Sequence, residues 1–322
     1  MRPPEVISAV DIGSNTAHLL VALVDDRTVT TLADESALLG LGAIVDREGR
    51  LPYAARAALL DALGGFAVIA QSWHAGELLL LGAEPLRRAA DAVEVGAAVL
   101  GRVGLPIVVL EHAQEAELTL LGVTRGRAVE APLLVVDIGG GSTEAVVQAP
   151  GAPPVTFVVP SGSNRLTASV EASDPPMPAD RDRLASEARA LLAGAAETRP
   201  ERAVFVGGSA TNLARVVAGV GGGDPAQPPS ELTRAGIDQA IHELDHVPSA
   251  VVADRYRVTP ARARLLPAGA ALVLAFMERY GLEAIEVSEA SLREGAVLAF
   301  RRAGSAWLER LTSLTVGWPE AA

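Results

Sequence analysis

Short apolar runs alternate with longer stretches of helical periodicity along most of this chain. The runs have the length of buried strands, and the stretches between them are rich in alanine and leucine. These patterns predict strands over 6–12, 18–24, 77–84, 105–111, 132–138, 144–148, 154–160 and 282–289, and helices over 52–75, 85–104 and 113–123. Because strands and helices alternate, we predict an α/β fold.

The pattern starts again part-way along the chain. Both "ISAVDIGSNTAHLLV" at 7–21 and "LLVVDIGGGSTEAVV" at 133–147 run from an apolar strand into Asp-Ile-Gly, a turn with hydroxyl groups and a returning strand. Two such units predict a duplicated domain. We place a first domain at 1–125 and a second at 126–322, and leave open that the last helix packs back on the first domain.

Composition narrows the cellular setting. Apolar residues make up 49% of the chain, yet no uninterrupted apolar run approaches a membrane span, and the N-terminus does not resemble a signal peptide. The chain has no cysteine, which excludes disulfides and thiolate metal sites. We therefore expect a cytoplasmic protein that does not associate with a membrane.

The charge balance restricts the partners. The net charge of −12, from 27 basic and 39 acidic residues, argues against general binding to nucleic acid or to a membrane surface. The sequence has no lysine, so every one of its basic residues is arginine. Any phosphate would have to be held by guanidinium groups, helix N-termini, backbone amides or a metal ion.

The two Asp-Ile-Gly turns suit an anionic ligand. Asp11 and Asp137 end strands, and open α/β folds bind ligands at the carboxyl ends of their strands. The glycines that follow let backbone amides approach an oxyanion, and the next Ser or Thr can donate its hydroxyl. The two aspartates would face each other across a cleft and bind Mg²⁺ directly or through water. Either turn taken alone is equally consistent with an ordinary glycine hairpin.

A third glycine turn lies in "AVFVGGSATNLARV" at 203–216. An apolar strand runs into Gly207 and Gly208, and Ser209 and Thr211 follow at the start of a helix. A helix N-terminus offers free amides and the positive end of the helix dipole, which suits an anion. The alternative is that Ser209 or Thr211 simply caps the helix.

Two helix starts carry residues that can act on a phosphate. Glu115 and Glu117 lie near the start of the helix at 113–123, where a carboxylate can accept a proton from water or merely stabilise the helix dipole. Arg87 and Arg88 lie near the start of the helix at 85–104. We expect Arg88 to be solvated, and Arg87 to be either a salt-bridge partner or a phosphate ligand.

Together the three turns resemble the phosphate and nucleoside loops of the actin, sugar-kinase and Hsp70 superfamily. The resemblance becomes specific with eight segments that follow one another in the order of the exopolyphosphatase and guanosine pentaphosphate phosphohydrolase family: "DIGSNTAHLLV", "EPLRRAADA", "QEAELTLLGV", "VVDIGGGSTE", "SGSNRLT", "VGGSATNLA", "RARLLPAG" and "SLREGAV". It covers nearly the whole chain and matches the short form of the family. It implies two duplicated actin-like, or ribonuclease H-like, domains with a cleft between them.

The same resemblance implies a role for each motif residue. Glu115 would be the catalytic base, and Asp137 and Glu144 would complete the catalytic set by holding the metal ion or the attacking water. Asp11, Asp137 and Glu144 would be the metal ligands, with Mg²⁺ as the ion and Mn²⁺ as the alternative. The phosphate-binding residues would be Ser14, Asn15, Thr16, Arg87, Gly139, Gly140, Gly141, Ser142, Thr143, Gly208 and Ser209.

The chain departs from the family pattern at both helix starts. His112 and Gln114 replace residues that are usual in the family, although Glu115 is retained. Glu84 and Asp91 flank the two arginines, and their negative charge would weaken phosphate binding or change the preferred chain length.

The expected reaction is hydrolysis of the terminal phosphoanhydride of inorganic polyphosphate, with release of orthophosphate. Guanosine pentaphosphate is the alternative substrate, because it presents the same terminal phosphate. Arg165, Arg264 and Arg293 are candidates for a positive run along polyphosphate, or else ordinary salt-bridge residues. A kinase that binds ATP or polyphosphate and a non-catalytic phosphate sensor are the alternatives of another class. We leave a homodimer open.

Overall fold

The computed structural model describes residues 2–316 and divides into two compact units. Unit 1 takes the described residues of Met1–Ala128, Gly151–Pro154 and Ala290–Ala322, and unit 2 takes Val129–Pro150 and Val155–Glu289. The chain therefore returns to unit 1 at Ala290, whereas the sequence placed all of 126–322 in the second domain apart from the open question of the last helix. The cleft expected between the domains stays a prediction.

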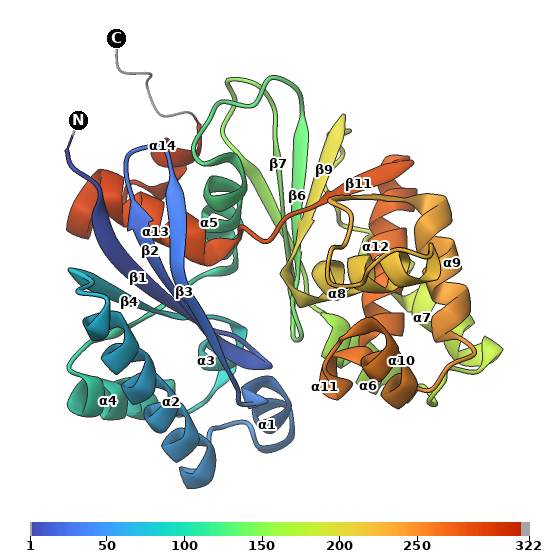
Figure 1. Ribbon diagram of the computed structural model, residues 1–322, viewed down its shortest axis with the longest axis horizontal. Coiled ribbons are helices and arrows are strands. Elements are labelled where there is room, and N and C mark those ends of the chain that lie inside the picture. The colour runs from blue at the N-terminus through green and yellow to red at the C-terminus, as the bar shows by residue number, and fades with distance from the viewer. Residues whose placement is uncertain (1, 317–322) are drawn as a thin grey trace. The chain divides into compact units, whose positions relative to one another are not determined.

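Unit 1 is a five-stranded sheet with helices on both faces. Its sheet order is β3-β2-β1-β4-β5, in which β1, β2 and β3 are antiparallel and β4 and β5 run parallel to β1. Its elements are β1 (Glu5–Ile12), β2 (Thr16–Val24), β3 (Val29–Leu38), α1 (Leu41–Glu48), α2 (Tyr53–Ser72), β4 (Glu77–Gly82), α3 (Glu84–Arg88), α4 (Ala92–Val103), β5 (Ile107–Val109), α5 (His112–Thr124), α13 (Leu292–Ala303), the 3₁₀ turn Gly304–Ala306 and α14 (Leu311–Thr315) (Figure 1).

Unit 2 is built around a six-stranded sheet of order β10-β11-β9-β6-β7-β8. Its elements are β6 (Leu133–Ile138), β7 (Thr143–Gln148), β8 (Val155–Val159), α6 (Ser163–Val170), α7 (Pro178–Leu191), β9 (Arg202–Val206), α8 (Gly207–Val220), β10 (Glu231–Thr233), α9 (Arg234–Leu244), α10 (Ser249–Tyr256), α11 (Pro260–Ala263), α12 (Leu266–Tyr280) and β11 (Ala284–Val287).

The two sheets share one topology. In each unit two strands lie on one side of a central strand and continue from it as an antiparallel meander, and two strands parallel to the central strand lie on its other side. The strand order β8-β7-β6-β9-β11 of unit 2 repeats β3-β2-β1-β4-β5 of unit 1. The duplication inferred from the two Asp-Ile-Gly segments thus extends to five strands of each sheet, and β10 is an addition in unit 2. The predicted α/β class is confirmed.

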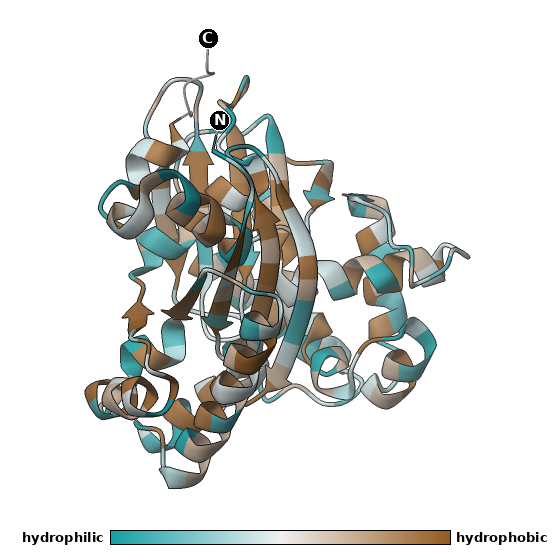
Figure 2. Ribbon diagram, turned by 60° about the vertical axis from the view of Figure 1, so that its left-hand side comes forward, coloured by the Kyte–Doolittle hydropathy of each residue, from teal (hydrophilic) through white to brown (hydrophobic). Residues whose placement is uncertain are grey.

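Alternation along the strands buries both faces of the unit 1 sheet. Ile7, Ala9 and Leu20 pack into a cluster with side chains of α5, α13 and α14, whereas Val10 and Leu19 pack into a second cluster with α1, α2 and α4. Figure 2 shows the apolar residues, in brown, concentrated along these strands. The near-continuous apolar runs of the sequence therefore arise because the strands are covered on both sides.

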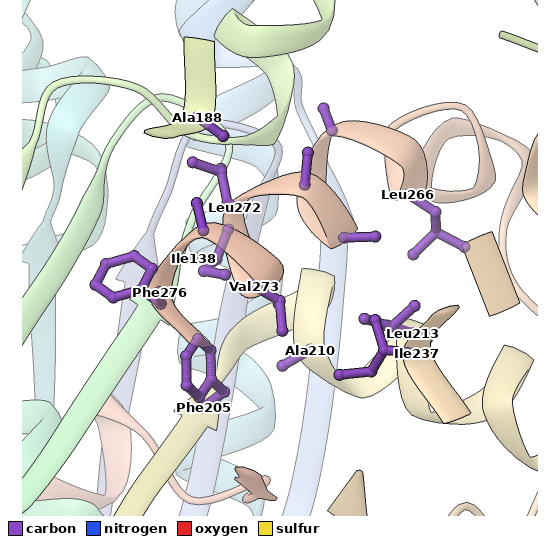
Figure 3. Close-up of a cluster of buried hydrophobic side chains, with 14 of the residues drawn as sticks. Ile138, Ala188, Phe205, Ala210, Leu213, Ile237, Leu266, Leu272, Val273 and Phe276 are labelled. Atoms are coloured by element: carbon purple, nitrogen blue, oxygen red, sulfur yellow. The ribbon is translucent and has the colours of Figure 1, made fainter. Parts of the chain in front are cut away.

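The core of unit 2 forms where α12 crosses one face of its sheet. Phe205 of β9 meets Phe276 of α12 edge to face, with ring centroids 5.8 Å apart. Ile138, Leu213 and Leu272 belong to the same buried cluster (Figure 3). Because Ile138 points into this core, its neighbour Asp137 points to the opposite face of the sheet.

The predicted helix at 85–104 is wrong in its continuity, because the structure breaks it into α3 and α4. Ala89 takes an extended conformation between them, at φ −63° and ψ 125°. The Asp91 carboxylate accepts a hydrogen bond from the Leu51 amide at 3.0 Å and pairs with Arg56 at 2.7 Å. These contacts with residues distant in the sequence explain the break. Helix propensity, which depends on local sequence, does not predict them.

Among the described residues, α2 alone has the length and apolarity of a helix that could cross a membrane. Leu59, Leu63 and Phe66 on one side of it are buried in the second apolar cluster of unit 1. One side of α2 therefore packs into the hydrophobic core of unit 1.

Helices α5 and α13 approach closely through two glycines. A Cβ at Gly122 would overlap the carbonyl oxygen of Ser291, and a Cβ at Gly295 would overlap that of Leu118. Only glycine allows backbones to approach this far, so these residues set the position of α5 on the sheet.

We predict that Gly295→Ala destabilises the protein by about 1–3 kcal/mol, because the added methyl must push α5 and α13 apart. The matched control is Gly96→Ala in α4, where a Cβ would meet nothing within 4 Å. That change should stabilise the protein by about 0.5–1 kcal/mol, since alanine is the better helix former. Urea denaturation followed by circular dichroism measures both. Equal stability of the two variants would contradict the close helix contact.

Candidate active site

The first Asp-Ile-Gly turn is a tight hairpin held by the helix that follows β3. The Gly13 amide donates to the Thr16 carbonyl at 3.0 Å and closes the turn. The Ser14 carbonyl accepts from the Gly42 amide at 2.8 Å, and the Asn15 carbonyl accepts from the Leu39 and Gly40 amides at 2.9 Å. The start of α1 and the two residues before it therefore fix Ser14 and Asn15, two of the three residues of this turn predicted to bind phosphate.

The second turn repeats this arrangement in unit 2. The Gly139 amide donates to the Ser142 carbonyl at 3.1 Å, and the Gly139 and Gly140 carbonyls each accept an amide from the start of α6 at 2.9 Å. Within the described part of the chain, the amides of Gly140 and Gly141 donate to no backbone carbonyl. Successive amides in such a glycine turn form a concave site for an anion.

Close packing explains a glycine outside the turn itself. A Cβ at Gly162 would lie 2.7 Å from the Gly140 carbonyl carbon, so a side chain there would displace the turn. The "SGSNRLT" segment thus supplies the support of the second turn.

Strand register pairs the two carboxylates of unit 2. Asp137 of β6 lies directly opposite Glu144 of β7, so both side chains are on the face away from the Phe205 core. Glu144 is buried, and its Oε1 accepts a hydrogen bond from the Ser142 hydroxyl at 2.6 Å. The equivalent pair in unit 1 is Asp11 opposite His18. Unit 2 therefore carries two adjacent carboxylates where unit 1 carries one.

The third turn meets Asp137 from the neighbouring strand. Gly207 has φ +82°, and a Cβ there would lie 2.5 Å from Oδ1 of Asp137. The N-cap of α8 is Val206 and makes no side-chain capping bond, while the Thr211 hydroxyl donates to the Gly207 carbonyl at 3.1 Å. The alternative that Ser209 or Thr211 caps this helix is therefore wrong.

Arg262 is a residue of this site that the sequence analysis did not select. A Cβ at Gly208 would lie 2.5 Å from the Arg262 guanidinium, which therefore covers the start of α8. Burial lowers the pKa of Arg262, and the negative charge of Asp137 acts in the opposite direction. The signal was present in "RARLLPAG", from which Arg264 was selected instead.

Not every predicted phosphate ligand presents its side chain to the carboxylates. Thr143 is fully buried, and its hydroxyl donates to the Ser161 carbonyl at 3.0 Å. It shares the face of Ala145, which is opposite to that of Glu144. Ser209 is buried beside Gly269, where a Cβ would lie 3.0 Å from the Ser209 Cβ.

Glu115 lies in the first turn of α5 in unit 1 and is buried. A capping box formed by Glu111 and Gln114 starts this helix, and the Glu111 amide donates to the Gln114 side chain at 2.8 Å. The glycine contact with α13 fixes the other end of the helix. Gln114, a departure from the family pattern, thus has a structural role in placing Glu115.

Arg87 of α3 is the partner of Glu115. Its Nη1 donates to the Glu115 carboxylate and to the Leu110 carbonyl, and its Nη2 lies 2.9 Å from Nδ1 of His112. The two side chains are only 13% and 8% exposed, so the ion pair is largely shielded from water. The structure therefore gives Arg87 the salt-bridge role that the sequence left open, and gives His112 a partner.

Glu84 and Asp91, the two acidic residues that depart from the family pattern, are each paired with a nearby arginine. Glu84 is buried, accepts the Ser14 hydroxyl at 3.0 Å and forms an ion pair with Arg88. Asp91 is bound to Arg56, as described above. Arg88 is exposed to solvent, as expected, and it also pairs with Asp46 at 2.6 Å.

The three arginines suggested for a positive run have different partners. Arg165 donates to the Gly141 carbonyl at 2.9 Å and so lies at the second turn. Arg264 donates to the Ala172 carbonyl, and Arg293 binds Asp34 at 3.0 Å and the Leu19 carbonyl at 3.2 Å. Only Arg165 of these three contacts a turn that is a candidate for phosphate binding.

The predicted metal ligands suit a hard cation by their chemistry. Asp11, Asp137 and Glu144 offer carboxylate oxygens, which Mg²⁺ and Mn²⁺ prefer. In neither unit do the described residues gather three His, Asp or Glu side chains that could hold a metal ion. A metal would therefore rest on the paired Asp137 and Glu144 in unit 2, with water or substrate oxygens as further ligands.

Most of the chain matches one protein family. Residues 20–301 match the Ppx/GppA phosphatase family. The chain belongs to this family. It is 29% identical over 91% of its length to exopolyphosphatase 1 of Mycobacterium leprae, and 30% identical over the same share to exopolyphosphatase 1 of Mycobacterium tuberculosis H37Rv, covering 88% and 87% of those proteins.

Solved structures of this Ppx/GppA family agree with the fold. The crystal structure of the Aquifex aeolicus family member aligns with a TM-score of 0.81 at 26% identity, covering 94% of this chain and all of that one. An exopolyphosphatase from Cytophaga hutchinsonii shares the fold with a TM-score of 0.83 at 22% identity, over 98% of this chain and all of that one. The two-domain actin-like fold expected for the family member is confirmed, while the roles of its individual site residues stay predictions.

We predict that Arg87→Met destabilises this family member by roughly 3–5 kcal/mol, because it leaves the Glu115 carboxylate buried without its cation. Adding Glu115→Gln to that variant should recover part of the loss. The control is Arg47→Met, whose ion pair with Glu48 is exposed and is worth at most about 1 kcal/mol. Chemical denaturation measures all variants, and an Arg87→Met loss no greater than the control would contradict the buried pair.

Proposed function

We propose that the protein is an exopolyphosphatase that hydrolyses the terminal phosphoanhydride of inorganic polyphosphate and releases orthophosphate. The observation that carries the proposal is the buried Glu115, held by Arg87 at the start of α5, in a chain similar over 91% of its length to proteins named exopolyphosphatase 1. A positioned carboxylate is what activation of water requires, and a kinase would have to keep water away from the phosphoryl group.

In this mechanism each group has a distinct task. Glu115 accepts a proton from water as the water oxygen attacks the terminal phosphorus, and the bond from phosphorus to the bridging oxygen breaks. The Gly140 and Gly141 amides and the start of α8 bind the oxygens of the terminal phosphoryl group, with Arg262 adding positive charge. Arg87 keeps the Glu115 carboxylate oriented. Asp137 and Glu144 would hold a metal ion in unit 2, which would supply neutralising charge.

We predict that Glu115→Gln lowers kcat by at least about 100-fold while the fold and polyphosphate binding are retained, because the amide cannot take up the proton. Glu117→Gln is the matched control two positions along, since Glu117 binds the Thr312 hydroxyl at 2.9 Å and is given no part in the reaction. Phosphate release measures turnover and calorimetry measures binding. Near-normal kcat in Glu115→Gln would remove Glu115 from the role of base.

We predict that removal of divalent metal abolishes phosphate release and that Mg²⁺ restores it, with Mn²⁺ as the alternative ion. The expected loss follows from the charge of the phosphate chain, which the described arginines only partly offset. Assays after chelation, followed by addition of each ion, test this. Asp137→Asn should raise the metal concentration needed for half-maximal activity, and full activity in chelator would refute the requirement.

Guanosine pentaphosphate remains the second candidate substrate. A stretch of 140 residues, 44% of this chain and 28% of the relative, is 34% identical to the guanosine-5'-triphosphate,3'-diphosphate pyrophosphatase of Vibrio cholerae. Parallel assays of phosphate release from short and long polyphosphate, ATP and guanosine pentaphosphate separate the candidates. Formation of ATP from polyphosphate and ADP would instead indicate a transferase, and tight binding without release would indicate a sensor.

We also place the enzyme in the cytoplasm, where polyphosphate and guanosine pentaphosphate would be its partners. The absence of cysteine and the acidic composition support this placement. A homodimer stays a prediction that light scattering of the purified protein tests.

A further inference from the structure

Glu84 is a buried carboxylate next to the first glycine turn, and the proposed reaction gives it no role. Its side chain is 5% exposed. One oxygen accepts the Ser14 hydroxyl at 3.0 Å, and the other is paired with Nε of Arg88. Arg88 in turn holds Asp46 of α1 at 2.6 Å. The Glu84 carboxylate is therefore fixed between the first glycine turn and Arg88, which also links α3 to α1.

This contact occupies the group that the turn would offer to a phosphate. A serine hydroxyl has one proton to donate, and an ionised carboxylate can only accept. While the Ser14 proton is directed at Glu84, the Ser14 oxygen cannot donate to a phosphate oxygen. A phosphate bound at this turn would have to take the proton from a charged acceptor, which is the stronger kind of hydrogen-bond partner.

The serine–carboxylate contact of the second turn differs from that of the first turn in the role of its carboxylate. There the Ser142 hydroxyl also donates to a carboxylate, that of Glu144 at 2.6 Å. Glu144 lies opposite Asp137 and belongs to the candidate metal ligands, so the proposed reaction already gives its carboxylate a role. Glu84 is paired with Arg88 instead, and nothing in the proposed reaction would release it.

We propose that Glu84 is a positioning residue that competes with the substrate for the Ser14 hydroxyl and so lowers the affinity of the first turn for a terminal phosphate. The inference rests on the proposed function in one respect, namely that this turn receives phosphate. Its consequence is an enzyme with a raised KM, suited to turnover where the polyphosphate concentration is high.

The variant Glu84→Gln tests this directly. Because Arg88 only donates, the Gln oxygen should face Arg88 and leave the Gln amide to donate to the Ser14 oxygen. The Ser14 proton is then available to phosphate. We expect KM for polyphosphate to fall at least fivefold, with the change in KM rather than in kcat. A KM within twofold of the parent enzyme would overturn the proposal.

Two further variants separate this effect from a general loss of negative charge. Asp91→Asn removes a buried carboxylate near the same helix that contacts Arg56 and not the turn, and should leave KM within twofold. In a Ser14→Ala background, Glu84→Gln should no longer lower KM, since the effect acts through the hydroxyl. An equal gain in that background, or in Asp91→Asn, would overturn the proposal.

Binding of orthophosphate by calorimetry gives a readout that does not depend on turnover. The Glu84→Gln protein should bind orthophosphate at least fivefold more tightly than the parent. If the parent hydrolyses no polyphosphate, the proposed function fails, yet this comparison still decides the role of Glu84. Glu84→Asp provides a second variant should Glu84→Gln not fold, because the shorter carboxylate keeps Arg88 but withdraws from Ser14. It should also tighten binding, and unchanged affinity in a folded variant would contradict the competition.

Discussion

A buried carboxylate is stable only when a cation or several hydrogen-bond donors compensate its charge, and this constraint shapes the candidate site of unit 1. Glu115 is paired with Arg87, Glu84 with Arg88 and Ser14, and Asp91 with Arg56. All three pairs converge on the short segment from α3 to the start of α4. That segment therefore links the first glycine turn, the helix of the proposed base and the outer helix α2.

A second constraint acts on the glycine turns. Their carbonyl groups need hydrogen-bond donors, while their amides must stay available to a ligand. In both units the helix that follows the third strand donates its first amides to the turn carbonyls. Close approach at Gly42 and Gly162 makes this possible. The duplicated sheets thus provide two similar glycine turns, and these differ in the carboxylates placed beside them.

This difference separates the two halves chemically. Unit 2 contributes the register pair Asp137 and Glu144 with the start of α8 and Arg262, an arrangement suited to a metal ion and phosphate. Unit 1 contributes Glu115 and its arginine, an arrangement suited to acting on water.

The sequence by itself determined most of the strands, though not β3 and β10, together with the duplication and the positions of the turns. These depend on local periodicity and on glycines that follow an aspartate, as in Asp11 and Asp137. Only the tertiary structure decided that Arg87 holds Glu115, that the helix breaks before Asp91, that Glu84 binds Ser14 and that Arg262 covers the third turn. The reason is physical: each of these outcomes depends on pairing between charges that lie far apart in the chain, and their distances exist only once the sheets and helices have packed.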